Sequence, residues 1–366
     1  MKFTVNQREM IYALNILTRA ISTKTTMEIL KGIFIEAKSN HLTMKTNDLS
    51  MSIIIEIPAL VEEEGVTVIE SNLFNDIVRK LPDDAITIEK KTDHISLICS
   101  QSQYKLMMMD DETFPQIQER SDGVEVVINQ SVFSNMIKMT NFAVSRDETR
   151  AILTGSLLEV KNNVMKMVSI DGYNIAIKKV ALQDAPDCSV IVPGRTLNEI
   201  QKIIGYNVDD EINLHIGTNY ITFEFDNVKI ISKVLEGEYI KYEQVIENDF
   251  GIDVEIDNRE FYEAIDRAAL MANQSRSYIV IFEFDNEKVT ITSQSEMGQA
   301  KEEVEIKNNG KNIRIGFNPN YLMKALRVIE DEELVVRMTS PVRPCFIQPK
   351  NNDSYEYYLV PIRINQ

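Results

Sequence analysis

The sequence contains no long apolar segment and no secretion signal. No stretch approaches the roughly 20 apolar residues that a membrane helix needs, and the longest β-rich stretch, Ser52–Ile57, ends at Pro58. The N-terminal residues MKFTVNQREM lack the apolar core and small-residue cleavage site of a signal peptide. We therefore expect a cytoplasmic protein that makes no use of a membrane.

Cysteine and histidine are also scarce. Cys99, Cys188 and Cys345 lie far apart without C-x-x-C spacing, which argues against structural zinc and against a disulfide framework. We expect buried free thiols. The three histidines are isolated, and the chain has neither an H-E-x-x-H motif nor a G-x-x-x-x-G-K-[ST] loop. The sequence thus predicts neither a cofactor nor ATP hydrolysis.

Positive charge is in deficit. The chain has 39 basic and 56 acidic residues, for a formal charge of -17. Taken alone, this balance argues against DNA binding, because lysine and arginine supply the affinity for phosphates. The distribution of the charge along the chain therefore matters more than its sum.

The length of 366 residues suits two or three domains, and the sequence contains a threefold repeat. Similar segments begin at Val5 (VNQREMIYALNIL), Ile128 (INQSVFSNMIKM) and Ile256 (IDNREFYEAIDRA). Each has a β-branched residue, a polar N-capping group and then an amphipathic helix. Their starts are separated by 123 and 128 positions, which indicates three repeats of about 120 residues each.

Two more elements recur at nearly the same spacing. A second helix in each repeat is marked by Phe74, Leu197 and Leu322, and a strand–turn–strand segment carries Asp48 and Asp171 at equivalent places. Alternating segments such as 85–88, 96–98, 221–225 and 278–284 read as strands. The pattern predicts an α+β fold: three repeated domains, 1–121, 122–249 and 250–366, each with two helices on antiparallel sheet. The boundaries are expected at the polar breaks 121–123 and 248–251.

The predicted helices carry most of the positive charge. They are expected at 7–20, 72–81, 130–143, 195–204, 258–272 and 319–329; together they carry +5, which leaves -22 on the rest of the chain. Apolar residues such as Phe74, Ile77 and Val78 form the inward stripe, so Arg79 and its repeat equivalents Lys202 and Arg327 face outward. A surface that is positive over its helices suits duplex DNA held by its phosphates, without base reading.

Two other functions are compatible with parts of the sequence. Acidic runs such as 110–112, 209–211 and 330–333 could hold a catalytic metal, although their turn-like context favours solvated turns. Alternatively, the helix faces could be ordinary solvated surfaces of a protein-interaction scaffold that does not bind DNA.

Several segments, in order and across nearly the whole chain, are similar to one family. They include TNDLSMSIIIE, ETFPQI, RAILTGSLLE, SIDGYNIAI, VIVPGRTLNEI, IGFNPNYLMKAL, MTSPVRPCFI and YYLVPIRI. Together they resemble the bacterial DNA polymerase III beta subunit, the sliding clamp. The resemblance implies a non-catalytic processivity factor of DNA replication, associated with the nucleoid, that encircles duplex DNA.

The resemblance also implies how the ring closes and which cations face the DNA. A head-to-tail homodimer would join the first domain, through Tyr104 and Leu106, to the third domain of its partner, through Leu270 and Met271. Lys24, Arg146 and Arg150 match family positions near DNA. With the helix-face cations, the predicted DNA-facing set is Arg8, Arg19, Lys24, Arg79, Lys80, Lys138, Arg146, Arg150, Arg195, Lys202, Arg267, Lys324 and Arg327.

Finally, the resemblance implies a cleft for short glutamine-leucine-type peptides of partner proteins. These partners would be the polymerase III alpha subunit or its equivalent, the clamp loader, other polymerases and repair proteins. Asn174 and Gln244 stand where the family often has arginine, and Ile240 replaces a common proline, so the motif preference is open. The matching positions are Leu153, Ile170, Gly172, Tyr173, Asn174, Ile175, Ile240, Gln244, Val245, Pro344, Val360, Pro361, Ile362 and Arg363.

Overall fold

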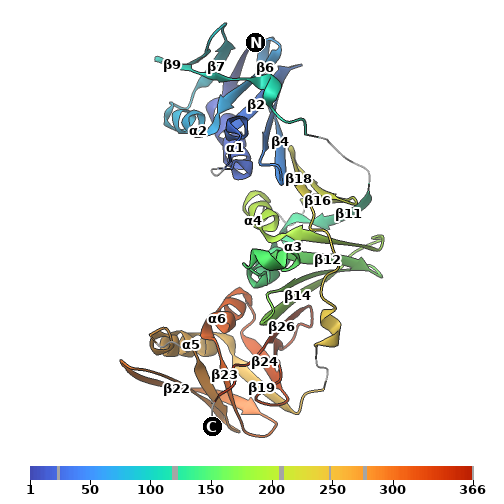
Figure 1. Cartoon of the computed structure of the whole chain (residues 1–366), viewed down its shortest axis with the longest axis vertical. Coiled ribbons are helices and arrows are strands. Elements are labelled where there is room, and N and C mark those ends of the chain that lie inside the picture. Colours follow the sequence, from blue (N-terminus) through green and yellow to red (C-terminus); the bar gives the residue numbers. More distant parts are fainter. Residues whose placement is uncertain (23–24, 118–122, 206–209, 247–248, 275–277, 365–366) are drawn as a thin grey trace. The chain divides into compact units, whose positions relative to one another are not determined.

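The computed structural model describes residues 1–22, 25–117, 123–205, 210–246, 249–274 and 278–364. It forms two compact units: Met1–Ser131 with Lys202–Val234, and Val132–Gln201 with Leu235–Gln366. Figure 1 shows the chain coloured along its sequence. No helix in the described part is long and apolar enough to cross a membrane.

All six predicted helices are present: α1 (Gln7–Leu17), α2 (Ser71–Lys80), α3 (Gln130–Thr140), α4 (Gly194–Ile203), α5 (Asn258–Ala272) and α6 (Pro319–Val328). The predicted last turns of the first and third are instead 3-10 helices, 18–20 and 141–143. A side-chain oxygen accepts from a backbone N–H at the start of α1 (Asn6), of α5 (Asp257) and of α6 (Asn318), as the polar residues before each helix predict.

The first unit contains two antiparallel sheets. The smaller has the strand order β5-β1-β7-β8-β9 and the larger the order β10-β6-β2-β3-β4-β18-β17-β16-β11. Helices α1 and α2 contact each other and pack against β4 and β6 of the larger sheet. The strands are β1 (Lys2–Asn6), β2 (Gly32–Lys38), β3 (His41–Asn47), β4 (Met51–Pro58), β5 (Leu60–Glu63), β6 (Gly65–Glu70), β7 (Ala85–Lys90), β8 (Ile95–Cys99), β9 (Ser102–Leu106), β10 (Met108–Met109), β11 (Val124–Asn129), β16 (Glu211–Ile216), β17 (Tyr220–Phe225) and β18 (Val228–Lys233).

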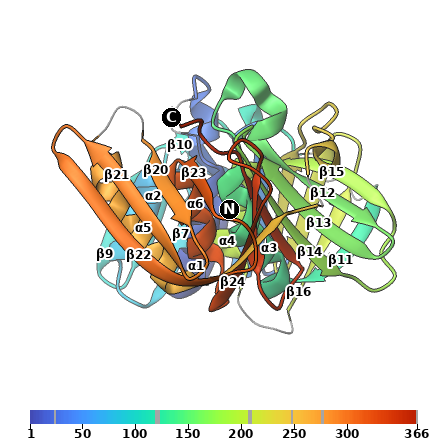
Figure 2. The ribbon, with the colours of Figure 1, turned by 90° about the horizontal axis from the view of Figure 1, so that it is seen from below.

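The second unit has one antiparallel arrangement of order β15-β12-β13-β14-β26-β25-β24-β19-β22-β21-β20-β23. Helices α5 and α6 pack on each other, and α5 lies over β20–β22 (Figure 2). α6 also packs against β26. The strands are β12 (Gly155–Lys161), β13 (Val164–Ile170), β14 (Asn174–Ala181), β15 (Cys188–Pro193), β19 (Ile252–Asp257), β20 (Val280–Phe284), β21 (Lys288–Ser295), β22 (Gly298–Asn308), β23 (Ile313–Phe317), β24 (Glu333–Met338), β25 (Cys345–Pro349) and β26 (Tyr355–Leu359).

Each sheet that carries helices crosses a boundary between repeats. β4 of the first repeat pairs with β18 of the second, with Ile53 opposite Ile230. β14 of the second repeat pairs with β26 of the third, with Ile175 opposite Tyr358. The compact units therefore divide the second repeat between them, a feature that sequence periodicity does not reveal because strand pairing is non-local.

The remaining differences from the sequence predictions are local. The strand expected at 278–284 begins only at Val280, since Tyr278 has a φ of 49°, outside the extended region. The three cysteines are free, as predicted, but Cys188 is only half-buried. Both predicted domain boundaries fall on or beside residues outside the described ranges, so their exact positions stay a prediction.

Candidate functional site

The candidate partner site is an apolar pocket in the second unit, with a cavity volume of about 200 Å³. It lies where the β13–β14 turn, strand β26 and the segment after β18 come together. Every residue that lines it except Tyr358 belongs to the predicted cleft: Ile170, Gly172, Tyr173, Asn174, Ile175, Ile240, Val245, Pro344, Tyr358 and Val360.

The β13–β14 turn forms one wall of this pocket. Asp171 holds the turn, because its carboxylate accepts from the backbone N–H groups of Tyr173 (2.8 Å) and Asn174 (3.0 Å). Gly172 has a φ of 97°, in the left-handed region that favours glycine. A guanidinium lies directly over it: a Cβ at Gly172 would come within 2.9 Å of Nη1 of Arg150. The turn therefore places the Tyr173 ring at the surface, 59% exposed.

The opposite wall comes from the segment between β18 and β19, which lies across the sheet of the second repeat. Tyr242, in the 3-10 helix Tyr242–Gln244, belongs to a buried cluster with Leu153, Ile170 and Tyr358. The Tyr239 hydroxyl donates to the carbonyl oxygens of Gly155 and Val168, at 3.3 and 3.2 Å. These contacts hold the segment in place and leave Ile240 and Val245 half exposed at the pocket, at 46% and 57%.

The segment that follows β26 forms the third side of the pocket. Val360 donates its N–H to the Tyr173 carbonyl at 2.9 Å, and Ile362 bridges to Gly316 on β23. Of the other predicted cleft residues, Leu153 is buried in a cluster with Ile170 and Tyr358, which line the pocket. The remaining predicted residues are not among the lining residues: Gln244, Pro361, Ile362 and Arg363. Asn365 and Gln366 lie outside the described residues.

Two tyrosines at this site are not among the residues predicted from the sequence. Tyr358 lines the pocket directly, and Tyr321 of α6 places its ring 6.0 Å from that of Tyr173. Burial, with the nearby Asp171 carboxylate, raises the pKa of the Tyr321 hydroxyl to about 12, so it stays protonated at neutral pH. The helical pattern of IGFNPNYLMKAL marks Tyr321 only as a helix residue, and its contact with Tyr173 depends on the tertiary fold.

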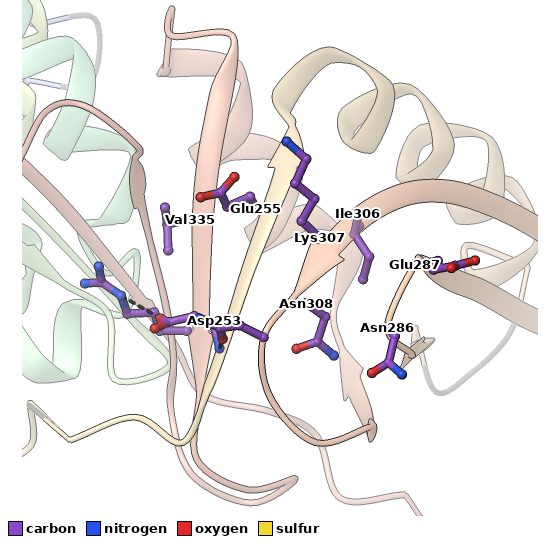
Figure 3. A pocket seen from close by; sticks show the side chains of 10 residues that line it. Asp253, Glu255, Asn286, Glu287, Ile306, Lys307, Asn308 and Val335 are labelled. Carbon is purple, nitrogen blue, oxygen red and sulfur yellow. Dashed lines mark hydrogen bonds and ion pairs between the residues drawn. The ribbon is translucent and has the colours of Figure 1, made fainter.

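A larger polar groove lies elsewhere in the second unit, with a volume of about 490 Å³. Its charges are largely compensated: Arg337 pairs with Asp253 at 2.8 Å and Lys350 with Glu255 at 2.9 Å. Figure 3 shows Lys307, Glu287 and Asn286 pointing in different directions instead of toward a common point. No group of side chains in the described part of the chain could hold a metal ion. The smaller apolar pocket is therefore the better candidate for a binding site.

The predicted DNA-facing cations fall into groups by their partners. Arg8, Lys138, Arg150 and Arg267 pair with carboxylates, of Asp83, Glu330, Asp147 and Glu302 respectively. Arg79 instead donates to two amide oxygens, and the Lys324 ammonium lies 5.9 Å from the Tyr321 ring centre. Arg19 is half-buried, and Lys24 lies outside the described residues. The exposed members are Arg8, Arg79, Lys80, Lys138, Arg146, Arg150, Arg195, Lys202, Arg267, Lys324 and Arg327.

The four positions predicted at the dimer interface differ in exposure. Tyr104 on β9 is 37% exposed and Leu270 on α5 is 62% exposed. Leu106 is buried and Met271 half-buried. β9 is the last strand of its sheet, and residues 298–305 of β22 pair on one side only, with β21. Each unit thus presents a strand edge near the predicted positions.

Comparison with known proteins identifies the family. Three family models match consecutive parts of the chain: the N-terminal domain of the DNA polymerase III beta subunit over residues 1–118, its central domain over 127–241 and its C-terminal domain over 243–363. The chain therefore belongs to the DNA polymerase III beta subunit family. This clamp is a processivity factor of replication, an accessory subunit with no catalytic role.

Individual relatives agree over the full length. The beta sliding clamp of Staphylococcus epidermidis is 34% identical, with 99% of each chain covered. The crystal structure of a putative DNA polymerase III beta subunit from Eubacterium rectale has a TM-score of 0.96 at 32% identity, and that of the DNA polymerase sliding clamp from Bacillus subtilis has a TM-score of 0.96 at 29% identity. Each structure covers 100% of both chains.

Proposed function

We propose that this clamp closes as a head-to-tail homodimer around duplex DNA, binds the DNA without reading its sequence and tethers partner proteins through the apolar pocket. Three repeats, 1–121, 122–249 and 250–366, build each subunit, and the ring works in the cytoplasm at the nucleoid. The observation that carries the proposal is the apolar pocket around Tyr173 in a chain whose whole length matches the clamp family.

The two strand edges support the closure of the ring. A heterologous contact, in which two different surfaces meet, closes a ring when the rotation between subunits permits. The edge of β9, beside Tyr104, is suited to pair with the free edge of β22, beside Leu270 and Met271, because unpaired strand edges readily pair with another chain. The dimer should have a mass of about 84 kDa, twice the 41.9 kDa chain. Leu270→Glu should shift the solution mass to the monomer, whereas a dimer that survives this change would contradict the assignment.

Encirclement has its own test. Clamps loaded onto a nicked circular plasmid should stay bound during gel filtration and should escape once the plasmid is linearised. Equal retention on both forms would rule out encirclement. Reversal of charge at Arg79, Lys202 and Arg327 together should impair loading or sliding without changing the dimer mass, because phosphate contacts are electrostatic.

The pocket has the chemistry that short peptide motifs need. Aromatic and aliphatic side chains supply an apolar anchor site, and the buried Asn174 is the polar residue of the lining. We propose that the replicative polymerase subunit, the clamp loader, other polymerases and repair proteins insert glutamine-leucine-type motifs here.

Binding of a labelled motif peptide tests this assignment. Val360→Asp should abolish binding, as should deletion of the chain from Val360 onward. Val342→Asp changes an equally apolar, 60% exposed side chain outside the pocket and should leave binding intact. Unchanged binding by Val360→Asp would contradict the assignment.

A further inference from the structure

The exposed guanidinium of Arg79 is held by two side-chain amides. On α2, its Nε donates to Oδ1 of Asn75 at 3.1 Å, one helical turn earlier. Its Nη2 donates to Oδ1 of Asn15 on α1. These two bonds fix the guanidinium between the two helices while it stays exposed. Both acceptors are uncharged amides, so the full positive charge remains available.

Three other exposed helix arginines each form an ion pair with a carboxylate. Arg8 pairs with Asp83, Arg259 with Glu263 and Arg267 with Glu302. A paired guanidinium must exchange its carboxylate for a phosphate before it can bind DNA, which reduces the net gain. Among the described residues, Arg79 makes no ion pair with a carboxylate. The Arg79 guanidinium is therefore held in a fixed orientation, and no carboxylate neutralises its charge.

We infer that Asn15 and Asn75 are positioning residues that hold Arg79 ready for a backbone phosphate of duplex DNA. The inference rests on the proposed function, because it assumes that the helix faces meet the duplex. An arginine fixed before binding loses less side-chain entropy when it contacts a phosphate. Amide acceptors suit this role, because a carboxylate at either place would hold Arg79 equally well and cancel its charge.

The isosteric variants Asn75→Asp and Asn15→Asp separate positioning from charge. Each keeps an oxygen acceptor for Arg79 and adds one negative charge beside it. The control is Asn72→Asp, which adds the same charge to an exposed position near the start of α2, about 10 Å from Arg79 along the helix axis at 1.5 Å per residue. Urea unfolding should show all three variants as stable as the parent.

The measurement is equilibrium binding of the full-length dimer to a short fluorescent duplex across a range of salt concentrations. The slope of log affinity against log salt reports the number of phosphates neutralised. Asn75→Asp and Asn15→Asp should reduce its magnitude by about 1, as should Arg79→Ala. They should weaken binding about fivefold at low salt, the upper end for one exposed ion pair. Asn72→Asp should keep the parental slope.

Asn75→Ala tests orientation alone, since it removes an acceptor without adding charge. It should weaken binding at every salt concentration and leave the slope unchanged. If Asn75→Asp and Asn15→Asp keep the parental slope while Arg79→Ala reduces it, Arg79 binds phosphate without help from the amides, and the inference fails. If the parent itself shows no salt-dependent DNA binding, the proposed function fails first.

Discussion

Gln7 donates its side-chain amide to the carbonyl oxygen of Leu81 at 3.2 Å, so the first residue of α1 closes the C-terminal end of α2. The second repeat uses Gln130, whose amide donates to the carbonyl of Glu211 and accepts from Gly205 N–H. The third uses Asn258. In the first and third repeats the amide satisfies carbonyl oxygens at a helix end, which have no partner within the helix. In every repeat a buried amide at the start of one helix thus ties it to the segment that ends or follows the other helix.

Asn258 should be the most sensitive of these positions. Its Nδ2 lies within hydrogen-bond distance of the carbonyl oxygens of Leu326 (3.4 Å), Ile329 (2.9 Å) and Asp331 (3.2 Å). Asn258→Ala leaves these buried acceptors unsatisfied and should lower the free energy of unfolding by about 1–3 kcal/mol. Urea denaturation followed by circular dichroism measures the change. Asn320→Ala, at an exposed position of α6, should cost less than about 0.5 kcal/mol; equal losses would show that the buried amide has no special role.

Gly172 should tolerate no side chain. Its φ of 97° is strained for any L-residue, and an added Cβ would meet the Arg150 guanidinium at 2.9 Å. Gly172→Ala should lower stability by about 1–2 kcal/mol and weaken binding of a motif peptide by displacing the turn that carries Tyr173. Calorimetry and peptide titration give both values. The control is Gly251→Ala, where no atom lies within 4 Å of the added Cβ; similar losses in both variants would contradict the steric argument.

Tyr173 should be a main anchor for partner peptides. Its exposed ring lines the pocket and lies 6.0 Å from the Tyr321 ring. Tyr173→Ala should weaken peptide binding about 10- to 100-fold, as truncation of an aromatic anchor commonly does. Tyr173→Phe keeps the ring and should bind within about threefold of the parent. Isothermal titration with one motif peptide compares them; an alanine variant that binds like the parent would remove Tyr173 from the site.

The sequence predicts local structure well and long-range structure poorly. The helical period identifies α2 and α6, and it correctly turns Phe74 and Leu322 inward. The pairing of Ile175 with Tyr358 joins residues more than 180 positions apart, and no local pattern encodes it. For the same reason Tyr358 reads only as one residue of an apolar strand. Helix periodicity also cannot show that Lys138 contacts Glu330, since the carboxylate comes from a distant loop.

The family resemblance supplied what the local patterns could not. It placed Ile240 and Val245 in the cleft although they belong to a segment without helical or strand periodicity. The structure brings both to the pocket, because Tyr239 and Tyr242 hold that segment against the sheet. Gln244, next to Val245 in the chain, is exposed and is not among the residues that line the pocket.

Lys178 should make the free energy of unfolding depend on pH in the alkaline range. It is only 9% exposed, and its ammonium donates to the Ser354 hydroxyl at 2.7 Å. Burial lowers the pKa of this ammonium below the usual 10.5, although Asp331 partly opposes the shift. The folded state therefore binds a proton more weakly than the unfolded state does. The contribution of Lys178 to the free energy of unfolding is least favourable at pH values where the lysine is charged in both the folded and the unfolded state. This contribution improves as the pH increases from the folded-state pKa to 10.5.

Lys178→Met should remove this penalty. At pH 7 the variant should be more stable than the parent by about 1 kcal/mol, because a buried charge is replaced by an apolar side chain of similar length. The advantage should shrink as the pH rises toward 10.5, where the parent lysine is neutral in the folded state. Thermal unfolding between pH 7 and 10.5 measures both effects. Lys179→Met, at the neighbouring half-buried lysine that pairs with Glu356, should not be stabilising. A Lys178→Met variant that is destabilised equally at both pH values would mean that the charge of Lys178 is fully compensated in the folded protein.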